Sequence, residues 1–294
     1  MTESMTAMAP ARDRRPPRSW RAGRTARAAL HYLVLTALAA AFAIPFLILL
    51  SSALKPATQD VFSFPPDLIP RPPSLDAFRR AWTSIDFPLY LRNSFILVLG
   101  TVPLSVLISA LTAYPLAVMR FPGRNLVFVA LLAAMFLPSE VMLIPLYLIV
   151  NDLGMANTFQ GVITPNLLTV FGILLLRQAF AAAPRELSDA ARIDGCGEWR
   201  IFWNVLLPVV RPTLAIVAIF GFINVWNDFL WPLVVLSDGN KYPVSLGVAY
   251  LKGISGTDVR LLSAGAVISV IPIILFFLIM QRQVMEGAKG AVKG

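Results

Sequence analysis

The side chains that could bind a solute stand inside apolar runs of this chain. The set comprises two carboxylates, two amides and an aromatic ring: Glu140, Asn224, Asn227, Asp228 and Trp231. Carboxylates and amides form hydrogen bonds with hydroxyl groups, and rings stack on apolar faces. An ionisable group costs about 3 kcal/mol near a bilayer centre, so such groups predict a translocation path. The alternative is an interfacial anchor or a helix–helix hydrogen bond. Counting about 1.5 Å per residue along straight helices places Glu140 and Asp228 in the outer third of a membrane.

A second polar region, the loop 182–208, separates two apolar runs and has a helical pattern of its own. Leu187, Ala190 and Ala191 share one helical face and predict a first short helix. Pro184 suits the start of this helix, and Gly195 ends it because glycine adopts the left-handed conformation at little cost. Acidic side chains near its start interact favourably with the helix dipole.

A second helix follows in the same loop. Its apolar residues recur at intervals of three and four: Trp199, Phe202, Trp203 and Leu206. We expect Pro208 to stop this helix. Two helices joined by a glycine turn are typical of a docking element that faces the aqueous phase. The alternative is a helix that lies on lipid headgroups.

Motifs for catalysis or cofactor binding do not occur in the sequence. There is no Gly-x4-Gly-Lys-Ser/Thr phosphate loop, no His-Glu-x-x-His and no Gly-x-Ser-x-Gly. Cys196 and His31 are the only residues of their types, which excludes a disulfide and argues against a metal site of clustered ligands. We therefore expect no enzyme, no metal and no cofactor in this chain, and any energy for transport must come from a partner.

Composition indicates that membrane-spanning helices position both regions. The chain is 57% hydrophobic and 14% charged, whereas soluble domains carry about 25% charged residues. Most of its apolar runs reach the roughly 20 residues that cross a bilayer, and they predict an all-α membrane protein with about six spans. The runs are 33–54, 95–119, 126–150, 161–176, 213–236 and 261–280. Pro165 and Asn166 leave the edges of the fourth uncertain.

Basic residues predict the orientation and the domain organisation. Most of the 25 lysines and arginines fall in the N-terminal tail and in every second connection, so we assign both termini and the loop 182–208 to the cytoplasm. We expect a disordered basic tail over 1–29, a transmembrane domain over 30–281 and a cytoplasmic tail over 282–294. The net charge of +9 follows largely from this asymmetry and indicates anionic lipid, not nucleic acid. The first apolar run is too long for a cleaved signal peptide.

The spacing of the loop 182–208 resembles the EAA loop of ATP-binding cassette (ABC) importer permeases. That pattern is Glu-Ala-Ala, three residues, glycine, nine residues, then Ile-x-Leu-Pro. The matching positions are Asp189, Ala190, Ala191, Gly195, Val205, Leu207 and Pro208. Asp189 replaces the usual glutamate and Val205 replaces isoleucine. Other segments, above all Trp-Asn-Asp-Phe at 226–229, resemble the carbohydrate-uptake branch and specifically the MalG-like inner-membrane permease.

This resemblance implies a multi-pass inner-membrane protein with the type I ABC importer architecture. It implies that the loop couples the permease to a cytoplasmic ATPase dimer, which binds ATP and Mg²⁺. A second homologous permease subunit and an extracytoplasmic solute-binding protein are implied as well. The residues to which it assigns the coupling role are Glu186, Asp189, Ala190, Ala191, Asp194, Gly195, Trp199, Phe202 and Pro208.

Two alternatives remain at this point. An ABC permease for another solute, such as a polyamine, would keep the loop and change only the solute-binding residues. A secondary transporter driven by an ion gradient would want charges near the midplane and broken helices in two repeats. We predict a neutral sugar or sugar derivative, because the apolar runs contain almost no basic residue away from their ends.

Overall fold

The computed structural model describes residues 18–64, 67–255 and 258–291, and every regular element in these ranges is helical. The chain divides into two units, residues 1–48 and 49–294. Residues 18–48 of helix α1 (Arg18–Leu54) are the described part of the first unit, and the portion Leu30–Leu54 of this helix is long and apolar enough to cross a membrane. It begins at Arg18, inside the segment 1–29 for which the sequence predicts disorder. Residues 1–17 and 292–294 of the two predicted tails lie outside the described residues.

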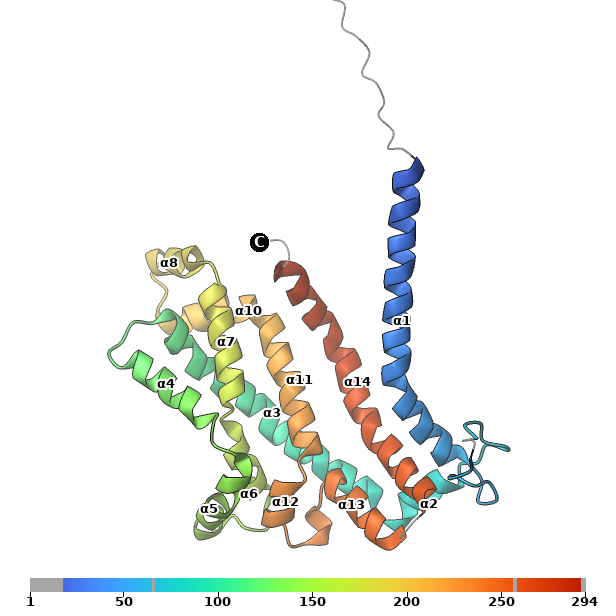
Figure 1. Ribbon diagram of the computed structural model, residues 1–294. Helices are drawn as coiled ribbons and strands as arrows, with labels where there is room; N and C mark the ends of the chain where they lie inside the picture. Colours follow the sequence, from blue (N-terminus) through green and yellow to red (C-terminus); the bar gives the residue numbers. More distant parts are fainter. Residues whose placement is uncertain (1–17, 65–66, 256–257, 292–294) are drawn as a thin grey trace, which may run out of the picture. The chain divides into compact units, whose positions relative to one another are not determined.

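Three long helices form the scaffold of the second unit: α3 (Phe87–Val118), α11 (Arg211–Asn227) and α14 (Val259–Ala291). Helix α3 packs against α11 and α7 (Val170–Ala182), and α11 also packs against α14 (Figure 1). Two short helices, α2 (Asp76–Ser84) and α13 (Val244–Ser255), contact α14 near its N-terminal end (Figure 1). Each of these long helices contacts several neighbours, so its buried apolar residues are spread around the helix and do not form a single amphipathic face.

The described residues reach the predicted count of about six spans if each of two bent helix pairs is one span: Arg124–Ala134 with Ser139–Asp152, and Glu198–Val209 with Arg211–Asn227. Four segments qualify as single spans: Leu30–Leu54, Phe87–Val118, Phe159–Ala182 and Val259–Gln283. The third predicted run is not one straight helix, because α4 (Arg124–Ala134) and α5 (Ser139–Asp152) meet at 103°. Pro138 lies in this bend, and a proline cannot donate the backbone hydrogen bond that a continuous helix requires.

The fourth and fifth predicted runs also differ from straight helices. The fourth is longer than its apolar core: α6 (Phe159–Ile163), the 3-10 segment η1 (Thr164–Leu167) and α7 together cover Phe159–Ala182. Pro165 and Asn166 occupy the 3-10 segment. In the fifth, α11 ends at Asn227 and α12 (Leu230–Val235) begins three residues later. These breaks place backbone and polar side chains inside apolar segments, which is tolerated only where they line a protein interior or a cavity.

Polar contacts fix the two ends of α3. At its start, Asn93 Nδ2 donates to the carbonyl oxygens of Asn240 and Tyr242, at 2.8 and 3.0 Å. At its other end, Tyr114 Oη donates to the carboxylate of Glu198 in the loop 182–208. Helix α3 therefore links the two ends of the second unit directly.

Candidate functional site

The loop 182–208 contains the two helices that the sequence predicts, and a left-handed glycine joins them. Helix α8 (Arg185–Ile193) ends at a turn in which Gly195 has φ +78°. Cys196 N donates to Ala191 O, and Gly195 N donates to Arg192 O. This double hydrogen bond is the Schellman motif, for which glycine is the preferred residue. The glycine thus sets the direction in which the chain leaves α8.

The second helix of the loop is continuous but not uniform. It comprises α9 (Glu198–Arg200), a π-helical segment η2 (Ile201–Leu206) and α10 (Leu207–Val209). The expectation that Pro208 stops this helix is wrong: Pro208 lies within α10, and the chain turns at Val210 before α11. The bend there is 78°. In the π-helical segment before Pro208 the backbone hydrogen bonds run from residue i to i−5 and not to i−4. Pro208 therefore removes no regular α-helical hydrogen bond.

The structure divides the predicted coupling residues between an inner and an outer face. Ala191 and Phe202 are buried against the protein's own helices, and Pro208 is partly buried. The exposed residues are Glu186, Asp189, Ala190, Asp194, Gly195 and Trp199. The predicted apolar face of Leu187, Ala190 and Ala191 is only partly correct, because α8 buries Ser188 beside Ala191 and leaves Leu187 and Ala190 exposed.

Several large apolar side chains of this loop are exposed. Ile193 is 87% exposed, Trp199 is 66% exposed and Leu187 is 41% exposed. One signal in the sequence indicated this exposure: Ile193 does not share the helical face of Leu187, Ala190 and Ala191.

A hydrogen-bonded cluster ties this loop to the end of α3. Tyr114 Oη donates to Glu198 Oε2 at 2.6 Å, and Arg192 Nε donates to Glu198 Oε1 at 2.9 Å. Arg192 Nη1 also donates to Asp189 Oδ1 at 3.0 Å. Glu198 therefore bridges α3, α8 and α9. The sequence analysis missed Tyr114, Arg192 and Glu198, although the opposite charges of Arg192 and Glu198 flank the glycine turn.

The charge of Glu198 depends on this cluster. The hydrogen bond from Arg192, followed by that from Tyr114, lowers the pKa of the Glu198 carboxyl below its ordinary value of 4.5. A depressed pKa in the folded state contributes stability that is fully present above the unfolded value. That contribution is lost as the pH falls through the lower, folded pKa.

We predict that Tyr114→Phe loosens the loop without disturbing the aromatic packing of α3. The variant removes one hydrogen bond to a charged group, worth about 1–2 kcal/mol after solvent screening. Its melting temperature is expected to fall by a few degrees at neutral pH, and the difference from the wild type should shrink as Glu198 becomes protonated below its folded pKa. Thermal unfolding of the purified chain across this pH range measures both effects. A constant difference down to the most acidic pH would contradict the assigned role of the Glu198 charge.

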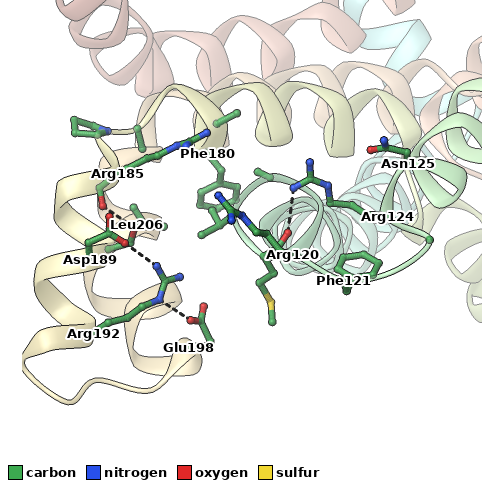
Figure 2. A pocket seen from close by; sticks show the side chains of 18 of the residues that line it. Arg120, Phe121, Arg124, Asn125, Phe180, Arg185, Asp189, Arg192, Glu198 and Leu206 are labelled. Carbon is green, nitrogen blue, oxygen red and sulfur yellow. Dashed lines mark hydrogen bonds and ion pairs between the residues drawn. The ribbon is translucent and has the colours of Figure 1, made fainter.

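A cavity of about 890 Å³ lies between this loop and the connection from α3 to α4; we call it the α8 cavity. Its charged lining residues are Arg120, Arg124, Arg185, Arg192, Asp189 and Glu198. Figure 2 shows the Asp189–Arg192–Glu198 chain along one wall and Arg124 on the opposite side. The cavity thus shares part of the loop that the sequence singled out.

A second cavity, of about 640 Å³, brings together all five of the solute-binding candidates; we call it the α12 cavity. Glu140, Asn224, Asn227, Asp228 and Trp231 line it. Glu140 occupies the first turn of α5 after the 103° bend, and Asp228 lies in the break between α11 and α12.

The broken helices explain why these groups converge. Asp228 Oδ1 accepts from Trp231 N at 3.3 Å and thereby caps the first turn of α12. The cavity is also lined by polar residues that the sequence analysis missed: Thr101 and Ser105 on α3, and Ser139, Asn166 and Thr169 at the helix breaks. Two of them, Ser139 and Asn166, directly follow a proline in an apolar run. Proline before a polar residue was therefore the available signal.

Trp226 belongs to the core and not to the α12 cavity. Its side chain is buried, and its Nε1 donates to Ser269 O at 3.0 Å. Its ring packs against Phe95 and Phe222 at centroid distances of 5.1 and 5.4 Å. Of the two tryptophans that flank the Asn-Asp pair, only Trp231 faces the cavity.

Comparison with known proteins identifies relatives of this chain. A family model described as "Binding-protein-dependent transport system inner membrane component" matches residues 105–286. This range includes the loop 182–208 and most of the residues that line the α12 cavity.

Individual relatives match over most of their length. The arabinooligosaccharides transport system permease protein AraQ of Halalkalibacterium halodurans is 35% identical, over 85% of this chain and 91% of its own. The diacetylchitobiose uptake system permease protein NgcG of Streptomyces coelicolor is 34% identical, over 82% and 80%. The sn-glycerol-3-phosphate transport system permease protein UgpE of Yersinia enterocolitica is 33% identical, over 77% and 84%.

A solved structure shares the fold. A chain of a bacterial ABC transporter involved in the import of the acidic polysaccharide alginate superposes with a TM-score of 0.73. It is 24% identical, and the match covers 91% of this chain and 98% of that one.

Proposed function

Because the chain belongs to the family of binding-protein-dependent transport system inner membrane components, we propose that it passes a neutral oligosaccharide through the α12 cavity. It is a multi-pass inner-membrane permease subunit of an ABC importer. The relatives are named for arabinooligosaccharides, diacetylchitobiose, lactose and sn-glycerol-3-phosphate. Family membership alone therefore allows both neutral and anionic solutes.

The charge of the residues that line the α12 cavity favours a neutral solute. Glu140 and Asp228 contribute carboxylates, and none of the described lining residues is a lysine or arginine. A phosphorylated or acidic sugar would meet two like charges there without a compensating cation, which is costly away from bulk water. Hydroxyl groups, in contrast, can donate to these carboxylates and pair with Asn224 and Asn227.

Trp231 supports the same assignment. Its side chain is 7% exposed, and no acceptor among the described residues pairs with its Nε1. A buried indole N–H without a partner loses free energy, so an incoming hydroxyl oxygen would stabilise it. Together with the carboxylates and amides, Trp231 makes the cavity wall able both to donate and to accept hydrogen bonds.

The exposed apolar side chains of Leu187, Ile193 and Trp199 support docking of a cytoplasmic ATP-binding subunit onto the loop 182–208. In this proposal ATP and Mg²⁺ bind to that subunit, and closure of its dimer moves α8. The Tyr114–Glu198–Arg192 cluster passes the movement to α3, whose Thr101 and Ser105 line the α12 cavity. A second permease subunit would complete the path, and an extracytoplasmic binding protein would deliver the solute.

The substrate class is tested with the reconstituted importer. We expect a binding protein loaded with a neutral oligosaccharide to stimulate ATP hydrolysis several-fold, and the same protein without solute to stimulate it weakly. The matched comparison is sn-glycerol-3-phosphate or an acidic oligosaccharide with its own binding protein, which we expect to give no stimulation. The two carboxylates of the cavity could also bind a cation. Stimulation only by a polyamine would therefore contradict the sugar assignment, but it would leave the permease role intact.

A further inference from the structure

We propose that the α8 cavity binds the phosphate group of an anionic phospholipid. The cavity is lined by four arginines against two carboxylates, so its described lining has a net positive charge. Both carboxylates are already engaged, since Asp189 and Glu198 pair with Arg192. The remaining positive charge belongs to Arg120, Arg124 and Arg185, and it is available to an anion that is not part of this cluster.

The free donors of these arginines face one space from two elements. Arg120 lies in the connection between α3 and α4, Arg124 begins α4, and Arg185 begins α8. None of the three forms an ion pair with a carboxylate of the described residues. A guanidinium has five N–H donors in a planar fork, a geometry that matches the oxygens of a phosphate.

The local backbone holds this arrangement. Gly123, with φ +83°, turns the chain into α4, and Arg124 Nη1 donates back to Met119 O at 3.1 Å. On the opposite wall, Ser188 Oγ donates to Arg185 O at 2.8 Å and fixes the first turn of α8. In Figure 2, Arg120 and Arg185 extend into the space between the two walls.

The apolar part of the lining favours a lipid over a soluble phosphate. The cavity lies at the ends of two spanning segments, Phe87–Val118 and Phe159–Ala182, on the side that we assign to the cytoplasm. Met119, Phe121 and Leu126 line it and are 36%, 38% and 74% exposed. Basic pockets between spanning helices at the cytoplasmic surface suit anionic headgroups, and the neighbouring apolar side chains suit the start of an acyl chain.

Lipid retention by the purified importer tests this site. Native mass spectrometry counts phosphatidylglycerol and phosphatidylcholine bound to the complex of the full-length chain. We expect the wild type to retain phosphatidylglycerol, and Arg120→Gln/Arg185→Gln to weaken this binding by roughly tenfold or more, because each basic residue near the surface contributes to the attraction. The matched control is Arg200→Gln/Arg282→Gln, which removes the same charge from two exposed arginines outside the cavity.

Three outcomes separate the interpretations. Equal losses in both double variants would overturn the proposal, because they would show general surface attraction. Equal retention of phosphatidylcholine and phosphatidylglycerol by the wild type would also overturn it. Binding of inorganic phosphate by the wild type without retention of phosphatidylglycerol would overturn the lipid assignment and assign the site to a soluble phosphate.

Discussion

Replacement of Phe202 by alanine is expected to lower the free energy of unfolding by about 3–5 kcal/mol and to abolish transport. Phe202 is 1% exposed, and its ring lies 5.3 Å from that of Tyr114 on α3 and 6.2 Å from that of Phe180 on α7. It thereby anchors η2 in the core that joins the loop 182–208 to the spanning helices. Without this anchor, movement of α8 is no longer transmitted to α3.

The control for Phe202→Ala is Trp199→Ala, three residues earlier on the same helix. Trp199 is 66% exposed, although its ring lies 6.1 Å from that of Phe202, so its removal should lower the melting temperature much less than Phe202→Ala and should weaken chiefly the association with the ATP-binding subunit. Thermal unfolding and co-purification with the ATPase distinguish the two variants. An unchanged melting temperature for Phe202→Ala would show that the loop is not held by this aromatic core.

Replacement of Gly195 by valine is expected to reduce uptake to a tenth or less while membrane insertion continues. The left-handed conformation at φ +78° costs a residue with a Cβ atom about 1–2 kcal/mol, and more when the side chain is β-branched. No neighbouring atom lies within 4 Å of the Cβ position, so backbone strain and not a clash is the cause. We expect the turn to relieve this strain by changing the angle between α8 and α9, which would displace the exposed side chains of α8 relative to Trp199.

The matched control is Gly197→Val, two residues away in the same turn. Gly197 has φ −75° and ψ 161°, an extended conformation that valine favours, and its Cβ position is also open. We expect this variant to retain most of the uptake. Proteoliposome uptake and ATPase co-purification compare the pair, and equal losses in both would refute the special role of the left-handed turn.

Local sequence signals correctly indicated the helical character of the chain and the two helices of the loop 182–208. A long apolar run predicts a spanning helix, because a backbone in lipid must pair its polar groups within the segment. Gly195 marked the turn because the left-handed conformation is a property of one residue. The resemblance in this loop likewise depended on spacing along a few turns of helix, and family membership is confirmed.

The positions of the helix breaks could be predicted only partly from the sequence. Pro138 and Pro165 stand at the interruptions of the third and fourth runs, yet a proline alone does not determine the angle of a bend. Pro208 illustrates the converse, because the chain continues as α10 and turns only at Val210. Neighbouring helices and the π-helical segment before Pro208 decide whether the freed backbone groups are satisfied.

The sequence by itself determined which residues are polar within apolar runs and which loop has the spacing of a docking element. Only the tertiary structure decided that Glu140 and Asp228 line one cavity, that Phe202 is buried while Trp199 is exposed, and that Tyr114 binds Glu198. Tyr114 and Glu198 are 84 positions apart in the chain, so no helical or strand period relates them. Their contact depends on how α3 and α7 pack, and that packing reflects the side chains of several helices at once.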